Sequence, residues 1–200
     1  MNFDDIAGSS IEFDRDFFFN LPKTDLHTHL DGSLRLETIM DLCRNDKVDL
    51  GVDSIEALGE LIGPGRMHTS LQEYLKSFDI TLKVMQTEAG LYRVAYELAE
   101  DASKENIQYM EVRFCPILHT DRGLSPTAIL ESVLTALRDA EKDFGILSGV
   151  IVSGIRNISP SVSLRLAELS VAFKNRGVVG FDLAGSEYNY PAKDHLDAFT

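Results

Sequence analysis

Apolar residues gather in four short runs along the chain, and each run has the character of a β-strand. Aliphatic and aromatic side chains dominate the runs, and turn-forming residues lie at their ends. The sequence therefore predicts four strands, at residues 23–29, 107–116, 146–156 and 178–183.

The segments between and after these runs carry apolar residues at helical spacing. Residues 70–73 (Ser-Leu-Gln-Glu) resemble a capping box, and the apolar stripe that follows continues to Met85. Ser125 followed by Pro126 is a typical helix start, with proline at the first helical position. The predicted helices cover residues 70–85, 88–104, 125–143, 160–174 and 191–199.

Strands that alternate with helices at this spacing imply right-handed crossover units and a parallel sheet. The segment between the first and second strands is long and helical. Four such units are half of an eightfold barrel, and a complete TIM-type barrel usually needs about 250 residues. We therefore expect an α/β fold: an incomplete TIM-type (β/α)8 barrel, with about the first four units and a helical insertion after the first strand.

Two parts are expected along the chain: an acidic N-terminal leader at residues 1–20 and the N-terminal part of a barrel at residues 21–200. The last helical pattern reaches Thr200 without a C-cap signal. We therefore expect the sequence to stop within the architecture rather than at a domain end.

The charge of the chain narrows the classes of partner. It carries 32 acidic and 19 basic side chains, a net charge of -13, which would repel nucleic acid and anionic membranes alike. Residues 1–20 lack the basic and apolar regions of a secretory signal, so we expect a cytoplasmic protein. Cys43 and Cys115 form no paired-cysteine motif and are expected to be reduced thiols.

The segment with the clearest chemical pattern is the first predicted strand. Side chains alternate between the faces of a strand, so Asp25, His27 and His29 project to one side and the two imidazoles converge. The C-terminal ends of barrel strands carry the active sites of barrel enzymes, which favours a metal-binding pair. The spacing alone leaves open that both histidines are exposed loop residues or hydrogen-bonded core residues.

The run LPKTDLHTHLDGSLR at residues 21–35 resembles the opening signature of the adenosine deaminase family, which are metal-dependent barrel hydrolases. SLQEYLKSFD, YMEVRFCP and VVGFDLAGSE follow in the same order. The resemblance implies that His27 and His29 are two ligands of one Zn²⁺ and that His29 also lies against the substrate. It further implies that Asp31 contacts the ribose hydroxyls of a nucleoside and that the backbone of Gly185 meets the purine.

Simpler interpretations of these residues exist. Asp31 precedes Gly and Ser and would suit a helix cap, and Gly185 would suit a turn. Tyr74, Leu75 and Phe78 match the family's apolar wall over the purine, although a stripe at helical spacing is equally typical of plain core.

The remaining charged and imidazole side chains are expected to be structural. Glu111 and Arg113 share a strand face and are expected to form an internal ion pair rather than line a pocket. His119 lies near the expected mouth of the barrel but matches no ligand of the family, and His68 and His195 are expected at the surface or at helix ends.

The resemblance implies that the complete protein hydrolyses adenosine, and deoxyadenosine as well, to inosine and ammonia in purine salvage. The family's third zinc histidine, its acid/base glutamate and its late aspartate ligand would all lie beyond Thr200, so no catalytic acid or base is expected here. We expect the 200-residue chain to be inactive alone. The alternatives are a related deaminase acting on adenine or a cyclic amide, or a non-catalytic truncated product. The sequence does not indicate the oligomeric state.

Overall fold

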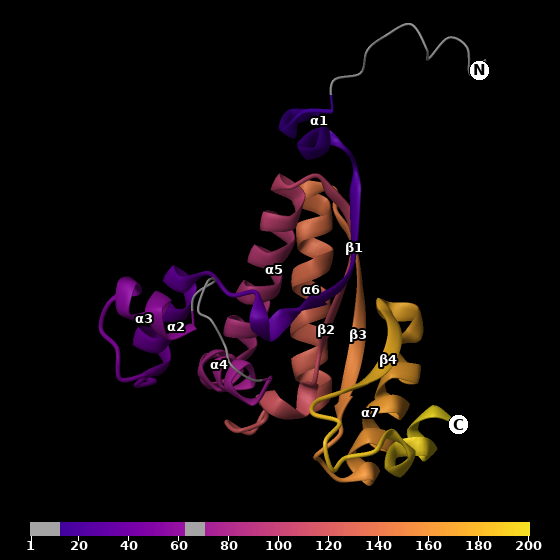
Figure 1. The fold of residues 1–200 in the computed structure, drawn as a ribbon. Coiled ribbons are helices and arrows are strands. Elements are labelled where there is room, and N and C mark those ends of the chain that lie inside the picture. The colour runs from indigo at the N-terminus through magenta and orange to yellow at the C-terminus, as the bar shows by residue number, and fades with distance from the viewer. Residues whose placement is uncertain (1–12, 63–70) are drawn as a thin grey trace, which may run out of the picture.

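The computed structural model describes residues 13–62 and 71–200, with the backbone alone for residues 71–77. Its centre is a four-stranded parallel sheet in which the spatial order follows the chain order (Figure 1). The strands are β1 (Lys23–His29), β2 (Ile107–Phe114), β3 (Leu147–Ile155) and β4 (Val178–Ala184). This progression, with each strand beside its predecessor, is that of a barrel segment.

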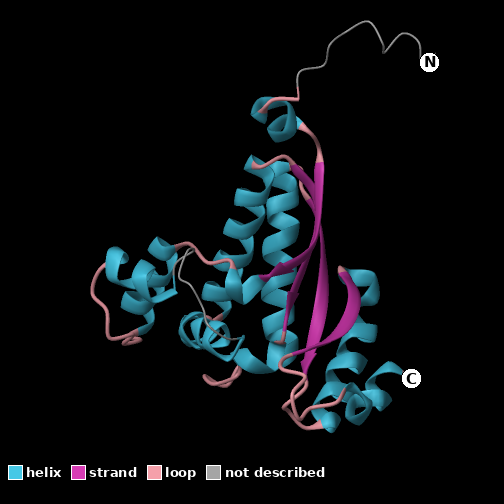
Figure 2. Ribbon diagram, in the orientation of Figure 1, coloured by secondary structure: helices cyan, strands magenta, loops and turns pink. Residues whose placement is uncertain are grey.

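Three long helices pack against the sheet, as Figure 2 shows. α5 (Glu88–Lys104) and α6 (Pro126–Phe144) lie along each other, and α7 (Pro160–Phe173) packs against β3 and β4. Local signals set their ends: the Ser125 hydroxyl accepts a bond from the Ala128 amide at 3.1 Å, and Gly145 ends α6 in the left-handed conformation at φ 74°. The core between these helices and the sheet includes fully buried Met110 and Ile129.

The helical insertion lies between β1 and β2, to one side of the sheet (Figure 1). It begins with the short turn η2 (Leu30–Gly32) and continues through α2 (Leu36–Asp46), α3 (Ile55–Ile62) and α4 (Leu71–Val84). The predicted capping box begins at Ser70, which lies outside the described residues. His68 lies outside them as well.

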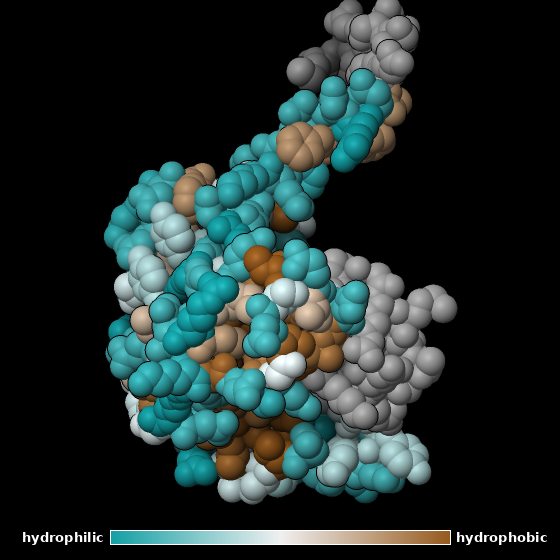
Figure 3. Space-filling view, turned by 90° about the vertical axis from the view of Figure 1, so that its left-hand side faces the viewer, coloured by the Kyte–Doolittle hydropathy of each residue, from teal (hydrophilic) through white to brown (hydrophobic). Residues whose placement is uncertain are grey.

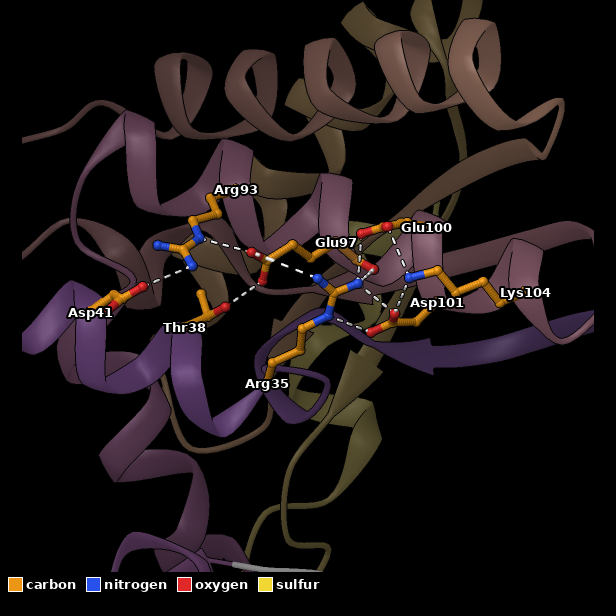
Figure 4. Close-up of polar contacts among 8 residues, drawn as sticks. All are labelled: Arg35, Thr38, Asp41, Arg93, Glu97, Glu100, Asp101 and Lys104. Carbon is orange, nitrogen blue, oxygen red and sulfur yellow. Dashed lines mark hydrogen bonds and ion pairs between the residues drawn. The ribbon is translucent and has the colours of Figure 1, made fainter. Parts of the chain in front are cut away.

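A polar network joins α2 of the insertion to α5 (Figure 4). Arg35, immediately before α2, donates to Asp101 at 2.8 Å and to Glu100 at 2.7 Å. Arg93 of α5 bonds Glu97 at 2.8 Å and reaches Asp41 of α2 at 3.1 Å. The network thereby fixes the start of α2, and with it the turn that follows β1, against α5. Its members are Arg35, Thr38, Asp41, Arg93, Glu97, Glu100, Asp101 and Lys104.

The four predicted strands are confirmed: the first has the predicted ends, and the ends of the other three differ by at most two residues. β2 ends at Phe114 because Pro116 opens a short 3-10 helix, η3 (Pro116–His119). Another 3-10 turn, η4 (Lys174–Arg176), separates α7 from β4.

The last predicted helix differs more. Residues 192–199 form a 3-10 segment, η5 (Ala192–Phe199), that is interrupted at His195. Of the two positions expected for His195, the surface is wrong: its side chain is buried, with Nδ1 2.9 Å from the Ser163 hydroxyl and Nε2 3.0 Å from the carbonyl of Arg156. These two contacts hold the ring at the point where the backbone departs from helical geometry. The helix-end position fits, because His195 lies at the kink between two helical segments.

Within the expected leader, the structure describes a short helix, α1 (Arg15–Asn20), just before β1 (Figure 1). The space-filling view shows this end of the described chain projecting from the body (Figure 3). Asp14 caps α1 by accepting from the Phe17 amide at 2.7 Å, and Phe18 is 54% exposed. Across the described part of the chain, no helix is both long enough and apolar enough to cross a membrane.

Candidate active site

The two histidines of β1 converge, as the strand pattern predicts. Nε2 of His27 and Nε2 of His29 are 3.2 Å apart, and the ring centroids are 5.2 Å apart. Both residues lie at the C-terminal end of β1, where barrel enzymes carry their sites. His27 is exposed and His29 is partly buried, so neither ring is enclosed in aliphatic packing.

The spacing of the two nitrogens fits joint coordination of one metal ion. Zinc–nitrogen bonds are about 2.0–2.1 Å long, so two imidazole ligands of a tetrahedral zinc lie roughly 3.4 Å apart. Among the side chains that the structure describes, at residues 13–62 and 78–200, no cluster of three metal-ligating groups is present. The pair therefore fits part of a zinc site, and the role of His27 and His29 as ligands stays a prediction.

Arg113 on β2 lies directly against this pair. Its Nη1 atom is 2.8 Å from Nε2 of His27 and 3.2 Å from Nε2 of His29. Its Nη2 atom is 2.5 Å from Oδ2 of Asp182 on β4. The expected ion pair of Arg113 with Glu111 is therefore wrong, and Glu111 instead accepts a bond from the Tyr109 hydroxyl at 2.9 Å.

The surroundings of His29 favour a neutral ring. Burial lowers the pKa of His29, and the positive charges of Arg113 and His27 lower it further. A neutral imidazole with a free nitrogen lone pair is the form that binds metals. The lowered pKa of His29 and the convergence of its ring with His27 thus both favour metal binding.

A cavity of about 320 Å³ opens beside His29 and is large enough for a small organic ligand. Asp31 lines it; the carboxylate is buried and its Oδ1 atom has no hydrogen-bond partner. Burial raises the pKa of Asp31 to about 6. Asp31 is not a helix cap, because it lies inside η2 and the cap positions are His29 and Ser33. Its contact with a ribose stays a prediction.

Gly185 also lines the cavity, immediately after β4. Its φ of 95° is accessible to glycine at little cost, and a side chain there would approach Ile155 to 3.2 Å. Gly185 is therefore both a turn glycine and a residue of the cavity lining. Its contact with a purine stays a prediction.

Sequence reasoning missed two residues of this site. Ser153 of β3 lines the cavity with a buried hydroxyl that has no hydrogen-bond partner, and Asp182 holds Arg113. The signal that could have found them is a polar side chain in an otherwise apolar strand, because such a group needs a partner.

The aromatic wall is described only in part. Phe78 of α4 lines the cavity, and its ring centroid is 5.9 Å from that of His29. A side chain at Gly32 would come within 3.3 Å of the Phe78 ring, so glycine there lets α4 approach the turn after β1. Tyr74 and Leu75 lie among the residues whose side chains are outside the described part.

His119 and Cys115 are not metal ligands in this arrangement. His119 is fully buried, and burial lowers its pKa to about 4. Its Nδ1 atom bonds the Met85 carbonyl at 2.9 Å. Burial raises the pKa of Cys115 to about 12, so the sulfur stays a thiol. Both cysteines are free, as expected.

Comparison with known proteins decides the family. The family model described as adenosine deaminase matches residues 22–200. The chain belongs to the adenosine deaminase family. The adenosine deaminase of Clostridium acetobutylicum is 39% identical over 180 residues, which cover 90% of this chain and 54% of that protein. The chain thus spans about half the length of such curated adenosine deaminases.

Solved structures extend the relationship. A zinc-bound amidohydrolase from Burkholderia ambifaria has a TM-score of 0.82 at 24% identity, covering 96% of this chain and 52% of its own, and shows the fold alone. An adenine deaminase from Arthrobacter aurescens has a TM-score of 0.79 at 26% sequence identity, and the match covers 89% of this chain and 53% of that protein. Arabidopsis ADAL complexed with GMP has a TM-score of 0.74 at 28% sequence identity, and the match covers 92% of this chain and 56% of that protein. The expected incomplete α/β barrel of an adenosine deaminase is confirmed.

Proposed function

We propose that the complete protein is a zinc-dependent hydrolase that converts adenosine, and deoxyadenosine as well, to inosine and ammonia in purine salvage. The observation that carries this proposal is the 3.2 Å convergence of the His27 and His29 Nε2 atoms beside a cavity. Membership of the adenosine deaminase family and the bound zinc of a structural neighbour support it.

Each residue of the site has a defined part in this reaction. His27 and His29 would hold the ion, which would activate a water molecule as the nucleophile at neutral pH by lowering its pKa to about 7. Asp31 receives the ribose hydroxyls, and the backbone of Gly185 lies against the purine. The remaining ligands and the acid/base glutamate would come from outside the 200 residues.

Two buried oxygen atoms at the cavity make no hydrogen bond, although Oδ1 of Asp31 lies 3.9 Å from Nδ1 of His29. Oδ1 of Asp31 and Oγ of Ser153 both lie at the cavity without a hydrogen-bond partner. Buried polar groups are normally hydrogen-bonded, so a ligand with several hydroxyl or ring nitrogen groups would stabilise this arrangement. Phe78 supplies an apolar surface for a flat purine ring.

Metal analysis of the complete gene product tests the proposal. We expect one zinc per site, and loss of both zinc and adenosine hydrolysis in His27→Ala and His29→Ala. Thr28→Val is the matched control, because Thr28 lies between them on β1 and its buried hydroxyl has no hydrogen-bond partner. Full zinc content in both alanine variants would refute the proposed centre.

A substrate panel separates the proposal from its closest rival. The rival is deamination of free adenine, which is supported by the adenine deaminase among the structural neighbours. Adenosine, deoxyadenosine, adenine and AMP should be compared by ammonia release. We expect the two nucleosides to be preferred, and Asp31→Asn to raise KM for adenosine more than for adenine. A preference for adenine would favour the rival.

A further inference from the structure

The Arg113 guanidinium contacts the same two ring nitrogens that the proposed metal ion would bind. Its Nη1 atom is within hydrogen-bond distance of Nε2 on both His27 and His29. A guanidinium can only donate hydrogen bonds, so a ring nitrogen that bonds it accepts through its lone pair. Zinc binds imidazole through the same lone pair. Arg113 and a metal ion therefore exclude each other from the histidine pair.

The same cluster offers the guanidinium a second position. Arg113 and Asp182 are joined through Nη2 and Oδ2, while Nε of Arg113 and Oδ1 of Asp182 are buried without a hydrogen-bond partner. Arginine pairs best with a carboxylate through two parallel bonds. If the guanidinium turned from the histidines toward Asp182, the two unpartnered atoms could meet and complete a bidentate pair.

We propose that Arg113 is a two-position residue that competes with the metal ion for His27 and His29. It holds the histidine pair before the ion arrives, and it pairs side-on with Asp182 once the ion is bound. Asp182 acts through Arg113, because it gives the displaced guanidinium its second position. This inference rests on the proposed metal centre.

Arg113 has two opposing effects on metal affinity, and their sizes decide the sign. By bonding both rings it orders two histidine side chains in advance, which favours binding by the small rotamer entropy of two rings. By occupying both lone pairs and placing a positive charge within about 4 Å of the ion, it opposes binding more strongly. Removal of the guanidinium should therefore tighten metal binding.

A double-mutant cycle on the 200-residue chain tests this competition. Zn²⁺ affinity is measured by calorimetry, and Co²⁺ absorption reports the number of nitrogen ligands. We expect Arg113→Met to bind at least about tenfold more tightly than wild type. Asp182→Asn should bind about threefold or more weakly, because the guanidinium loses its second position. The double variant should match Arg113→Met.

Two further variants keep the test decisive if Arg113→Met does not fold. Arg113→Lys retains a charge for Asp182 but lacks the planar fork that reaches both histidines, so it should also bind the ion more tightly than wild type. Arg176→Met removes an arginine whose pair with Glu131 at 2.9 Å is far more exposed, and it should leave affinity unchanged.

Three outcomes would overturn the inference. Equal or weaker binding by Arg113→Met and Arg113→Lys would mean that the guanidinium does not compete. A double variant as weak as Asp182→Asn would mean that Asp182 acts on the ion directly. Binding that survives His27→Ala and His29→Ala would refute the metal centre itself, whereas binding that depends on them but not on Arg113 would refute this inference alone.

Discussion

The backbone conformation of Gly185, which lines the cavity, is one that favours glycine. Gly185, just after β4, has a φ of 95°, whereas Gly180, within β4, has an extended backbone with its nearest neighbour at 3.5 Å. The two glycines therefore form a matched pair for a test of local strain.

Gly185→Ala should lower the free energy of unfolding by about 1–2 kcal/mol, because an L side chain is strained at positive φ. Gly180→Ala should change it by less than about 0.5 kcal/mol, since its added methyl group meets only ordinary contact distances. Urea unfolding of both variants and the wild type checks this difference. Equal losses would show that the conformation of Gly185 carries no special cost.

The buried imidazole of His119 should make stability depend on pH. Its pKa is about 4 when folded against 6.5 as the reference value. Above pH 6.5 both states are neutral and the effect is absent. As the pH falls from about 6.5 toward 4, the unfolded state takes up a proton that the folded state does not, so stability falls by up to about 3 kcal/mol.

This pH dependence can be isolated with His119→Asn, whose side-chain amide can still donate to the Met85 carbonyl. Urea unfolding between pH 7 and pH 4.5 should give a steeper loss of stability for the wild type than for the variant. Parallel pH profiles would contradict the assignment.

At the residue scale the sequence predicted the direction of the His27 and His29 rings, because strand alternation is a local property. It did not predict the contact of Arg113 with Asp182, which joins β2 to β4 across the curved sheet. It also missed the burial of His195, since that depends on Ser163 and Arg156, residues more than thirty positions earlier in the chain.

At the scale of elements, the Arg35 network decides how α2 is held against α5. The Arg35 guanidinium meets carboxylates of Glu97, Glu100 and Asp101 and is only 30% exposed, whereas Arg44 on α2 is 68% exposed and pairs with Asp41. Exposed pairs contribute little to stability, while networks with less exposed arginines contribute more.

Arg35→Ala should therefore lower the free energy of unfolding by about 1–2 kcal/mol, and Arg44→Ala by less than about 0.5 kcal/mol. Hydrogen exchange of the α2 amides should accelerate in the first variant only. If both arginines give the same small effect, the network is not what holds α2.

The positions of strands and helices were predicted best, because apolar runs and capping residues such as Ser125 are local features of the sequence. The 3-10 form of η5 was not predicted, since tertiary contacts of His195 override its helical pattern.

At the scale of the whole molecule, β1 and β4 are the edges of the described sheet. Val179 on β4 is 53% exposed and Val171 on α7 is 74% exposed. An apolar strand edge without a covering element is a site of self-association. The purified 200-residue chain should therefore associate with itself as its concentration rises.

Val179→Lys should reduce this association, because a charged side chain on an edge strand opposes strand pairing. Leu147→Lys is the control: Leu147 is equally exposed, at 53%, but lies on the inner strand β3. Size-exclusion chromatography with light scattering compares the three proteins. Association that Val179→Lys leaves unchanged would place the contact elsewhere.

The insertion between β1 and β2 has a consequence for the order in which the chain folds. Lys23 pairs with Ile107, so β1 joins its neighbour only after a loop of about 80 residues closes, whereas β2, β3 and β4 are linked by much shorter crossovers. Loop closure is slow when the separation is large. The three later strands can therefore assemble first, and the strand that carries both histidines docks last.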